Sequence, residues 1–360
     1  MEIGIFGLPL SGKTTLFNLL TNSSAETGFA SSKKKANMGI SKVPDARLDD
    51  LARIWSPKKT TYTTVNYVDV AGVEKGGEKG LSSDVMTSLK NTDALLVVVR
   101  QFASDMVPHP EETIDPKRDV SILTSEMLLS DLVIVETRLE RIAKQMKGKV
   151  PDEVLREKEL MLKLQGILEE ERPLRDVELS ADEIKIIKGF QFLTLKPLII
   201  VVNTGEDDIS EGDALAAELI GAINSPKVAV THLCAEIEQE ISQLSAEEAT
   251  EFLADLGIEE PATARIIRTS YELLGLISFF TMGEDECRAW TVERGAKAPR
   301  AAGVIHSDLE RGFIRAEVVS YDDFVSAGSL AACRDKGLLS TEGKEYVVKD
   351  GDILNIRFNV

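Results

Sequence analysis

The sequence predicts an α/β protein: a mainly parallel sheet, a helical hairpin inserted into it, and a small β-rich module at the C-terminus. Strand-like apolar runs alternate with helix-like segments before and after the insertion, which favours parallel strands with right-handed crossovers. Between them, apolar residues from Leu128 to Met146 recur at alternating four- and three-residue steps, a heptad pattern. From Ile277 the pattern changes to short strands and turns. We divide the chain accordingly into residues 1–124, 125–190, 191–276 and 277–360.

A glycine-rich turn near the N-terminus carries the clearest chemical signal. Residues 7–14 read Gly-Leu-Pro-Leu-Ser-Gly-Lys-Thr, the phosphate-loop pattern, between a strand-like run and a helix-like run. The loop amides and the helix N-terminus would hold phosphate oxygens, with Lys13 at the β- and γ-phosphates and the Thr14 hydroxyl on Mg²⁺. The sequence therefore predicts a nucleoside triphosphate site. Its expected loop contacts are Leu10, Ser11, Gly12, Lys13, Thr14 and Thr15.

A second strand-like run ends at Asp69-Val70-Ala71-Gly72. Asp69 is the expected second Mg²⁺ partner, through water, and the Gly72 N–H is expected to approach the γ-phosphate. Ras-type GTPases carry a Gln at the next position to orient the attacking water, whereas here the residue is Val73. Hydrolysis is then slow, or another residue supplies the polar group. Upstream, Asp45 to Trp55 has the pattern of a short helix.

Two later strand ends predict the base-binding part of the site. One run ends at Asn203, with Thr204 and Glu206 where GTPases carry the Lys and Asp of their guanine-binding motif. The longer Glu206 side chain loses the guanine-matched geometry, which favours relaxed or adenine preference. The last strand-like run is followed by Cys234, Ala235 and Glu236, where a second base-contacting loop is expected. Ligands bind at the carboxyl ends of such strands.

Composition excludes several classes of protein. The net charge of −18 argues against a protein that coats nucleic acid over its whole surface. No run approaches the roughly 18 to 20 apolar residues of a membrane span, and three cysteines form neither a disulfide framework nor a metal motif. The expected location is the cytoplasm, without a membrane partner. Basic and aromatic residues interleave after Arg288, which suits either RNA contact or a solvated face.

These residues together resemble the Obg-like ATPases of the YchF family. The most specific matches are residues 69–72, Asn203-x-x-Glu206, and residues 190–197, and the run from Arg288 to Val318 looks like the family's TGS domain. The resemblance implies a P-loop NTPase G domain, an inserted antiparallel coiled-coil hairpin, and a C-terminal β-grasp-like TGS domain.

The resemblance also implies an activity. Family members prefer ATP to GTP and associate with ribosomes, here through the TGS domain and the hairpin, by contacts with the ribosome or with RNA. Together with Val73 and the expected metal residues, this predicts a slow, Mg²⁺-dependent ATPase. Family members use a histidine of a mobile loop in place of the missing Gln. That histidine corresponds to His109, which local sequence alone would assign to an ordinary surface loop. Lys13, Gly72 and His109 are thus the expected catalytic residues.

The sequence departs from the family pattern in two places. Leu10 and Ser11 replace an Asn-Val pair, and residues 31–34 replace the Pro-Phe-x-Thr of the first switch, so the Thr expected on Mg²⁺ is absent. Two alternatives stay open: an ATP-dependent binding module without hydrolysis, and an Obg-type GTPase of ribosome assembly. Oligomeric state is left open by the sequence, with a monomer favoured.

Overall fold

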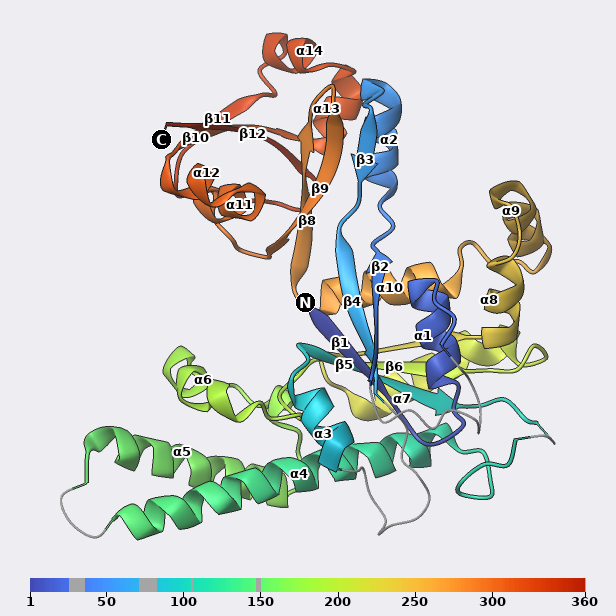
Figure 1. Ribbon diagram of the computed structural model, residues 1–360, viewed down its shortest axis with the longest axis vertical. Helices are drawn as coiled ribbons and strands as arrows, with labels where there is room; N and C mark the ends of the chain where they lie inside the picture. Colours follow the sequence, from blue (N-terminus) through green and yellow to red (C-terminus); the bar gives the residue numbers. More distant parts are fainter. Residues whose placement is uncertain (26–35, 71–82, 105–106, 147–149, 360) are drawn as a thin grey trace. The chain divides into compact units, whose positions relative to one another are not determined.

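The computed structural model describes residues 1–25, 36–70, 83–104, 107–146 and 150–359 (Figure 1). The chain forms two compact units. The first consists of Met1–Ile40 and Asn66–Ile266, and the second of Ser41–Val65 and Ile267–Val360. The second unit is therefore built from two stretches of chain that are far apart in the sequence.

The first unit contains a six-stranded sheet in the order β2-β4-β1-β5-β6-β7. The pairings of β1 with β4 and β5, and of β5, β6 and β7 in succession, are parallel. Residues 95–99 and 198–202, in two central strands, are all apolar because helices cover both faces of such a sheet, and all of them are buried. The strands are β1 (Glu2–Phe6), β2 (Asn37–Lys42), β4 (Thr64–Asp69), β5 (Ala94–Arg100), β6 (Leu198–Asn203) and β7 (Val228–Leu233).

Helices connect these strands, as the alternating pattern predicts. Those between strands of this sheet are α1 (Lys13–Thr21), α3 (Ser83–Lys90) and α7 (Gly212–Ile223), whereas α8 (Ala235–Ile241), α9 (Ala246–Asp255) and α10 (Ala262–Leu273) follow β7. One core cluster joins β5 and β6 to α3, α7 and the first part of α4, with Leu89, Met127 and Leu219 as buried members. The motifs that predict nucleotide binding follow the carboxyl ends of β1, β4, β6 and β7.

The predicted hairpin is present as α4 (Pro116–Gln145) and α5 (Asp152–Glu169), which lie side by side and antiparallel (Figure 1). Val135, Met161 and Leu164 form the buried seam, and Arg138 holds Glu157 across it through two hydrogen bonds of 2.7 Å. The first helix starts earlier than the heptad pattern indicates, because Asp115 caps its N-terminus and Pro116 occupies its first turn.

The chain returns from the hairpin to the sheet through α6 (Ala181–Ile187), which opens with the predicted capping box of Ser180 and Glu183. Beyond it, the buried Asp131 of α4 accepts hydrogen bonds from the backbone N–H groups of Leu193 and Thr194, at 2.9 and 2.7 Å. These hydrogen bonds connect α4 to the segment that precedes β6.

The second unit has a six-stranded sheet in the order β11-β10-β12-β8-β9-β3. Its strands are β3 (Lys59–Thr61), β8 (Leu276–Met282), β9 (Glu286–Glu293), β10 (Phe313–Ser320), β11 (Ser340–Glu342) and β12 (Asp352–Phe358). The helices of its C-terminal part are α11 (Ala298–Ile305), α12 (Ser307–Arg311), α13 (Tyr321–Ala327) and α14 (Leu330–Asp335). This is the small β-rich module that the sequence predicts.

The strand β3 and the helix α2 (Ala46–Trp55) also belong to this unit. β3 pairs in parallel with β9 at the sheet edge, and Leu48 and Leu51 of α2 are buried with Phe280 and Phe324. The sequence predicts the helix but not the unit that it joins. A pattern of apolar residues shows that one face of a helix is buried, but it does not show which part of the chain covers that face.

Candidate nucleotide-binding site

Two glycines of the phosphate loop are required by its geometry. Gly12 has a φ of 97°, in the left-handed region, and a Cβ there would overlap the side-chain amide of Asn203. A Cβ on Gly7 would overlap the carbonyl oxygen of Val98. The loop therefore lies directly against the ends of β5 and β6. Helix α1 begins at Lys13 without a side-chain cap, which leaves its first N–H groups available to an anion.

Lys13 is a buried cation in this loop, with 7 % of its surface exposed. Its Nζ donates a hydrogen bond of 2.7 Å to the carbonyl oxygen of Leu8. Burial lowers its pKa to about 8, and the Asp69 carboxylate partly opposes the shift. Because a buried ammonium group is costly without negative charge beside it, this position is suited to phosphate oxygens.

Thr14 and Asp69, the two predicted metal partners, lie together. The Thr14 Oγ1 donates a hydrogen bond of 3.0 Å to Asp69 Oδ2, although the residues are 55 positions apart. Asn37, which the sequence analysis did not single out, donates to the same oxygen at 3.3 Å. Burial raises the pKa of Asp69, against the two hydrogen bonds and the charge of Lys13. A hydroxyl beside a carboxylate is an oxygen donor set that fits Mg²⁺.

Asn203 connects the phosphate loop to the predicted base-binding loops. Its Nδ2 donates to the Ser11 carbonyl oxygen at 3.1 Å, and its Oδ1 accepts from the Ala235 N–H at 3.2 Å. Thr204 is buried and donates to Leu233 through both its backbone N–H and its hydroxyl. A Lys at this position would keep the backbone bond but lose the hydroxyl bond, so the Thr204 side chain has a local structural role.

Cys234 is buried, and two exposed residues, Glu206 and Glu236, lie near enough to act on its thiol. Burial raises the pKa of its thiol, and the two carboxylates raise it further, against backbone N–H groups at the start of α8. The cysteine is therefore held as a neutral thiol, which is the less reactive form.

Two residues at the end of β5 were missed by the sequence analysis. Arg100 is 2 % exposed, and burial lowers its pKa. Its Nε donates to the Phe102 carbonyl oxygen at 2.9 Å, and its guanidinium lies 4.3 Å from the centre of the Phe102 ring. Phe102 borders the segment that contains Glu206, since a Cβ on Gly205 would lie 3.7 Å from that of Phe102. Only the fold reveals this neighbourhood.

His109, the predicted water-activating residue, lies in the loop before α4. Its Nε2 is 3.0 Å from Asp119 Oδ2, and its Nδ1 accepts from the Glu111 N–H at 3.1 Å. Arg118 donates twice to the other oxygen of Asp119, at 3.1 and 2.8 Å. The partners of His109 thus come from its own loop and from α4.

The predicted γ-phosphate residue Gly72 lies outside the described residues, as do Val73 and the unusual segment 31–34. Their roles stay predictions.

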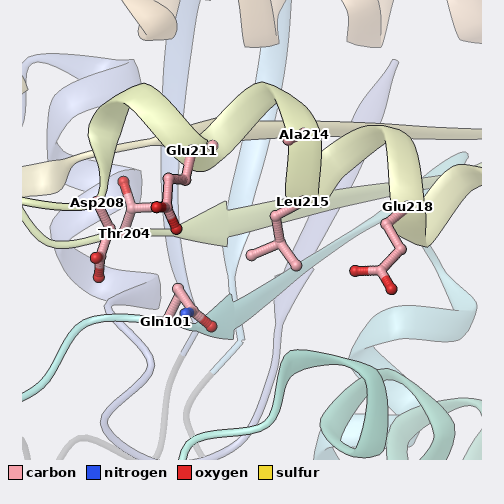
Figure 2. Close-up of a pocket in the computed structure, with 8 residues that line it drawn as sticks. Gln101, Thr204, Asp208, Glu211, Ala214, Leu215 and Glu218 are labelled. Atoms are coloured by element: carbon pink, nitrogen blue, oxygen red, sulfur yellow. The ribbon is translucent and has the colours of Figure 1, made fainter.

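A pocket of about 540 Å³ lies beside the predicted base-binding loops (Figure 2). Figure 2 shows Thr204, Asp208 and Glu211 close to one another, with Glu218 farther along α7 and Gln101 below. The carboxylates make this pocket unfavourable for phosphates, whereas the phosphate loop offers helix N–H groups and Lys13.

In the described part of the chain, no three His, Cys, Asp or Glu side chains gather as a metal cluster. None of the described helices has the length and apolar content needed to cross a membrane.

Comparisons with known proteins match the whole chain. Family models match residues 2–138 (MMR_HSR1, "50S ribosome-binding GTPase") and residues 276–359 (YchF-GTPase_C, "Protein of unknown function (DUF933)"). A protein of Bacillus subtilis named "Ribosome-binding ATPase YchF" is 42 % identical, covering 100 % of both chains. One of the same name from Escherichia coli O157:H7 is 40 % identical over 100 % of this chain and 99 % of its own.

The fold is matched as well. The solved structure entitled "Structure of the Schizosaccharomyces pombe YchF GTPase" has a TM-score of 0.86 and 33 % identity, covering 99 % of this chain and 97 % of the other. This agreement confirms the predicted P-loop NTPase domain with its inserted hairpin, and it is consistent with a TGS-like fold for the C-terminal module. Since relatives of about this length match from end to end, the chain belongs to the YchF family.

Proposed function

We propose that this protein is a Mg²⁺-dependent P-loop ATPase with slow hydrolysis, whose nucleotide state controls binding to the ribosome. The observation that carries the nucleotide site is Lys13, a cation buried in a glycine loop, whose partners among the described residues are a neutral carbonyl and the Asp69 carboxylate. The names of the bacterial relatives, ribosome-binding ATPases, support the activity and the partner.

Each residue of the site has its own role in this proposal. Lys13 and the backbone from Leu10 to Thr15 hold the phosphates. Thr14 and Asp69 would hold Mg²⁺, which when bound supplies positive charge that stabilises the developing phosphate charge. Asn203 and Glu206, with the loop from Cys234 to Glu236, surround the base. Gly72 and His109 serve hydrolysis, with Gly72 at the γ-phosphate and His109 as the group that takes a proton from water.

The preference for ATP is the part of the proposal that rests on one side chain. The bacterial relatives are named ATPases, whereas the fission-yeast structure is entitled a GTPase. Glu206 stands where a guanine-specific site has the shorter Asp, and its side chain is exposed. Adenine offers one exocyclic amine rather than the two adjacent donors of guanine, so the longer side chain suits adenine better.

Calorimetric titration of ATP and of GTP, each with Mg²⁺, tests this assignment. We expect clear ATP preference in the wild-type protein, gain of GTP binding in Glu206→Asp, and no binding of either in Lys13→Ala. Clear GTP preference in the wild type would return the chain to the Obg-type GTPases. Single-turnover hydrolysis, with Lys13→Ala as the background, tests the enzymatic part.

A binding module that does not hydrolyse ATP is the second candidate. It is favoured by the arrangement of His109, whose two ring nitrogens are both occupied by protein partners. Hydrolysis no faster than in Lys13→Ala would establish this alternative.

The ribosome or RNA contact is proposed for the helical insertion, residues 125–190, and the TGS-like module, residues 277–360. On the latter, the Arg288 guanidinium lies 3.9 Å from the centre of the Trp290 ring, and such a pair can stack on a base. Co-sedimentation with ribosomes in ATP and in ADP, for wild type and Arg288→Glu, checks this assignment. The monomeric state and the cytoplasmic location stay predictions.

A further inference from the structure

Strand β2 runs closely against helix α1. A Cβ on Gly39 would lie 2.6 Å from the Thr21 side chain, so the strand backbone touches the helix at this point. Thr14 lies two helical turns before Thr21 on the same face of α1. Asn37 lies two positions before Gly39, on the same face of the strand. The two elements therefore run alongside each other, and Asn37 lies at the phosphate-binding end of α1.

At this end, Asn37 and Thr14 act on the same atom. The Asn37 Nδ2 and the Thr14 Oγ1 both donate to Asp69 Oδ2, at 3.3 and 3.0 Å. Within the described part of the chain, Asp69 Oδ1 receives no hydrogen bond. Asp69 as a whole is only 4 % exposed, so protein donors, rather than bulk water, set the orientation of its carboxylate.

The two donors differ in what they can do when a cation is present. The Thr14 hydroxyl oxygen is itself a proposed metal ligand. The Asn37 amide is a neutral donor whose contact is with the carboxylate, and it leaves the negative charge of Asp69 intact. Groups that orient a metal-binding carboxylate in this way strengthen metal binding without touching the ion.

We infer that Asn37 is a positioning residue of the Mg²⁺ site: by holding Asp69 Oδ2 it keeps Oδ1 directed to the hydrated cation. This inference rests on the proposed Mg²⁺–nucleotide function. The threonine that is usual in the first switch is absent from this chain. Asn37, shortly after that segment, is a side chain from the same part of the sequence that would still act at the metal site.

The test compares nucleotide affinity with and without the metal. The dissociation constant of a fluorescent ADP analogue is measured in excess Mg²⁺ and in EDTA, and the ratio of the two values gives the gain due to Mg²⁺. For Asn37→Ala we expect this gain to fall about tenfold, the size typical of lost orienting groups, with the value in EDTA unchanged. Asp69→Asn serves as the benchmark for loss of the gain.

Met38→Ala is the matched control. Met38 lies next to Asn37 in β2 and is 66 % exposed, so its truncation tests for general disturbance of the strand. It should leave both affinities and the thermal midpoint at the wild-type values.

Each other outcome has a distinct meaning. If Asn37→Ala weakens binding equally in Mg²⁺ and EDTA, its role is structural and the inference is wrong. An unchanged gain also overturns it. If the wild-type protein itself binds the nucleotide no better with Mg²⁺, the metal part of the proposed function fails, and this inference fails with it.

Discussion

His109 and Asp119 form a buried pair in which the His109 Nε2 lies 3.0 Å from Asp119 Oδ2, with 4 % and 1 % of the side chains exposed. Because the His109 Nδ1 accepts a hydrogen bond from the Glu111 N–H, the ring proton lies on Nε2 and is donated to Asp119. A general base must present a free lone pair to water. In this arrangement the only lone pair of the ring is on Nδ1 and accepts from the Glu111 N–H, so His109 must leave both Glu111 and Asp119 before it can act on water.

Asp119→Asn should therefore accelerate hydrolysis. A hydrogen bond to a neutral amide is weaker than one to a carboxylate by about 1 kcal/mol, so we expect the single-turnover rate to rise about fivefold. The rate is measured with excess protein over ATP.

The double variant His109→Ala, Asp119→Asn is the control and should hydrolyse ATP at the rate of His109→Ala alone. A slower Asp119→Asn protein would mean that Asp119 assists His109 during catalysis instead of retaining it.

Nucleotide binding should take up a proton at alkaline pH. In the free protein, burial lowers the Lys13 pKa from 10.5 to about 8, and phosphate charge beside it must raise that pKa again. Little proton uptake is expected well below pH 8, and up to one proton per nucleotide just above it. Calorimetry in buffers of different ionisation enthalpy measures the number directly.

The same shift predicts a stability effect in the free protein. Between about pH 8 and 10.5 the unfolded chain holds a proton that the folded chain has lost, so the free energy of unfolding rises with pH in this window.

The control for the proton uptake is Lys13→Arg. This variant keeps its charge throughout, so nucleotide binding to it should take up no proton. Uptake in Lys13→Arg equal to wild type would assign the proton to another group.

Gly12→Ala should abolish nucleotide binding and lower the thermal midpoint, because the new methyl group would overlap the Asn203 amide at a left-handed φ of 97°. Gly166→Ala is the matched comparison. It lies within α5, is exposed, and has no neighbour within 4 Å of an added Cβ. There the change should stabilise the protein by roughly 0.5–1 kcal/mol through helix propensity. Normal ATP affinity in Gly12→Ala would contradict the loop geometry.

Asp131→Ala should destabilise the first unit by about 3 kcal/mol or more. Three buried donors, the N–H groups of Leu193 and Thr194 and the Thr194 hydroxyl, would lose their acceptor. Urea unfolding followed by circular dichroism measures the loss. Leu129→Ala, a truncation of a 57 % exposed side chain on the same helix, should change stability by no more than about 0.5 kcal/mol. A small effect of Asp131→Ala would mean that water replaces the carboxylate.

Much of the fold could be predicted because its signals are local or periodic. The strand, glycine turn and helix around Lys13 form one continuous stretch, and the heptad pattern from Leu128 indicates a helix pair without reference to the rest of the chain. The gathering of Thr14, Asp69 and Asn203 near one loop follows from a general rule, that parallel strands place their carboxyl ends along one edge.

The tertiary structure alone decided the contacts between segments that share no pattern. Asn37 and Asp69 are 32 residues apart, and neither sequence environment indicates the other. The apolar face of α2 could have covered either sheet, and only packing against Phe280 placed it in the second unit. His109 likewise has no sequence feature that fixes it, whereas in the structure the Glu111 N–H and Asp119 of α4 both hold its ring. Periodicity determines which residues are buried, whereas the partner of a buried or polar group depends on shape and hydrogen bonding between distant parts of the chain.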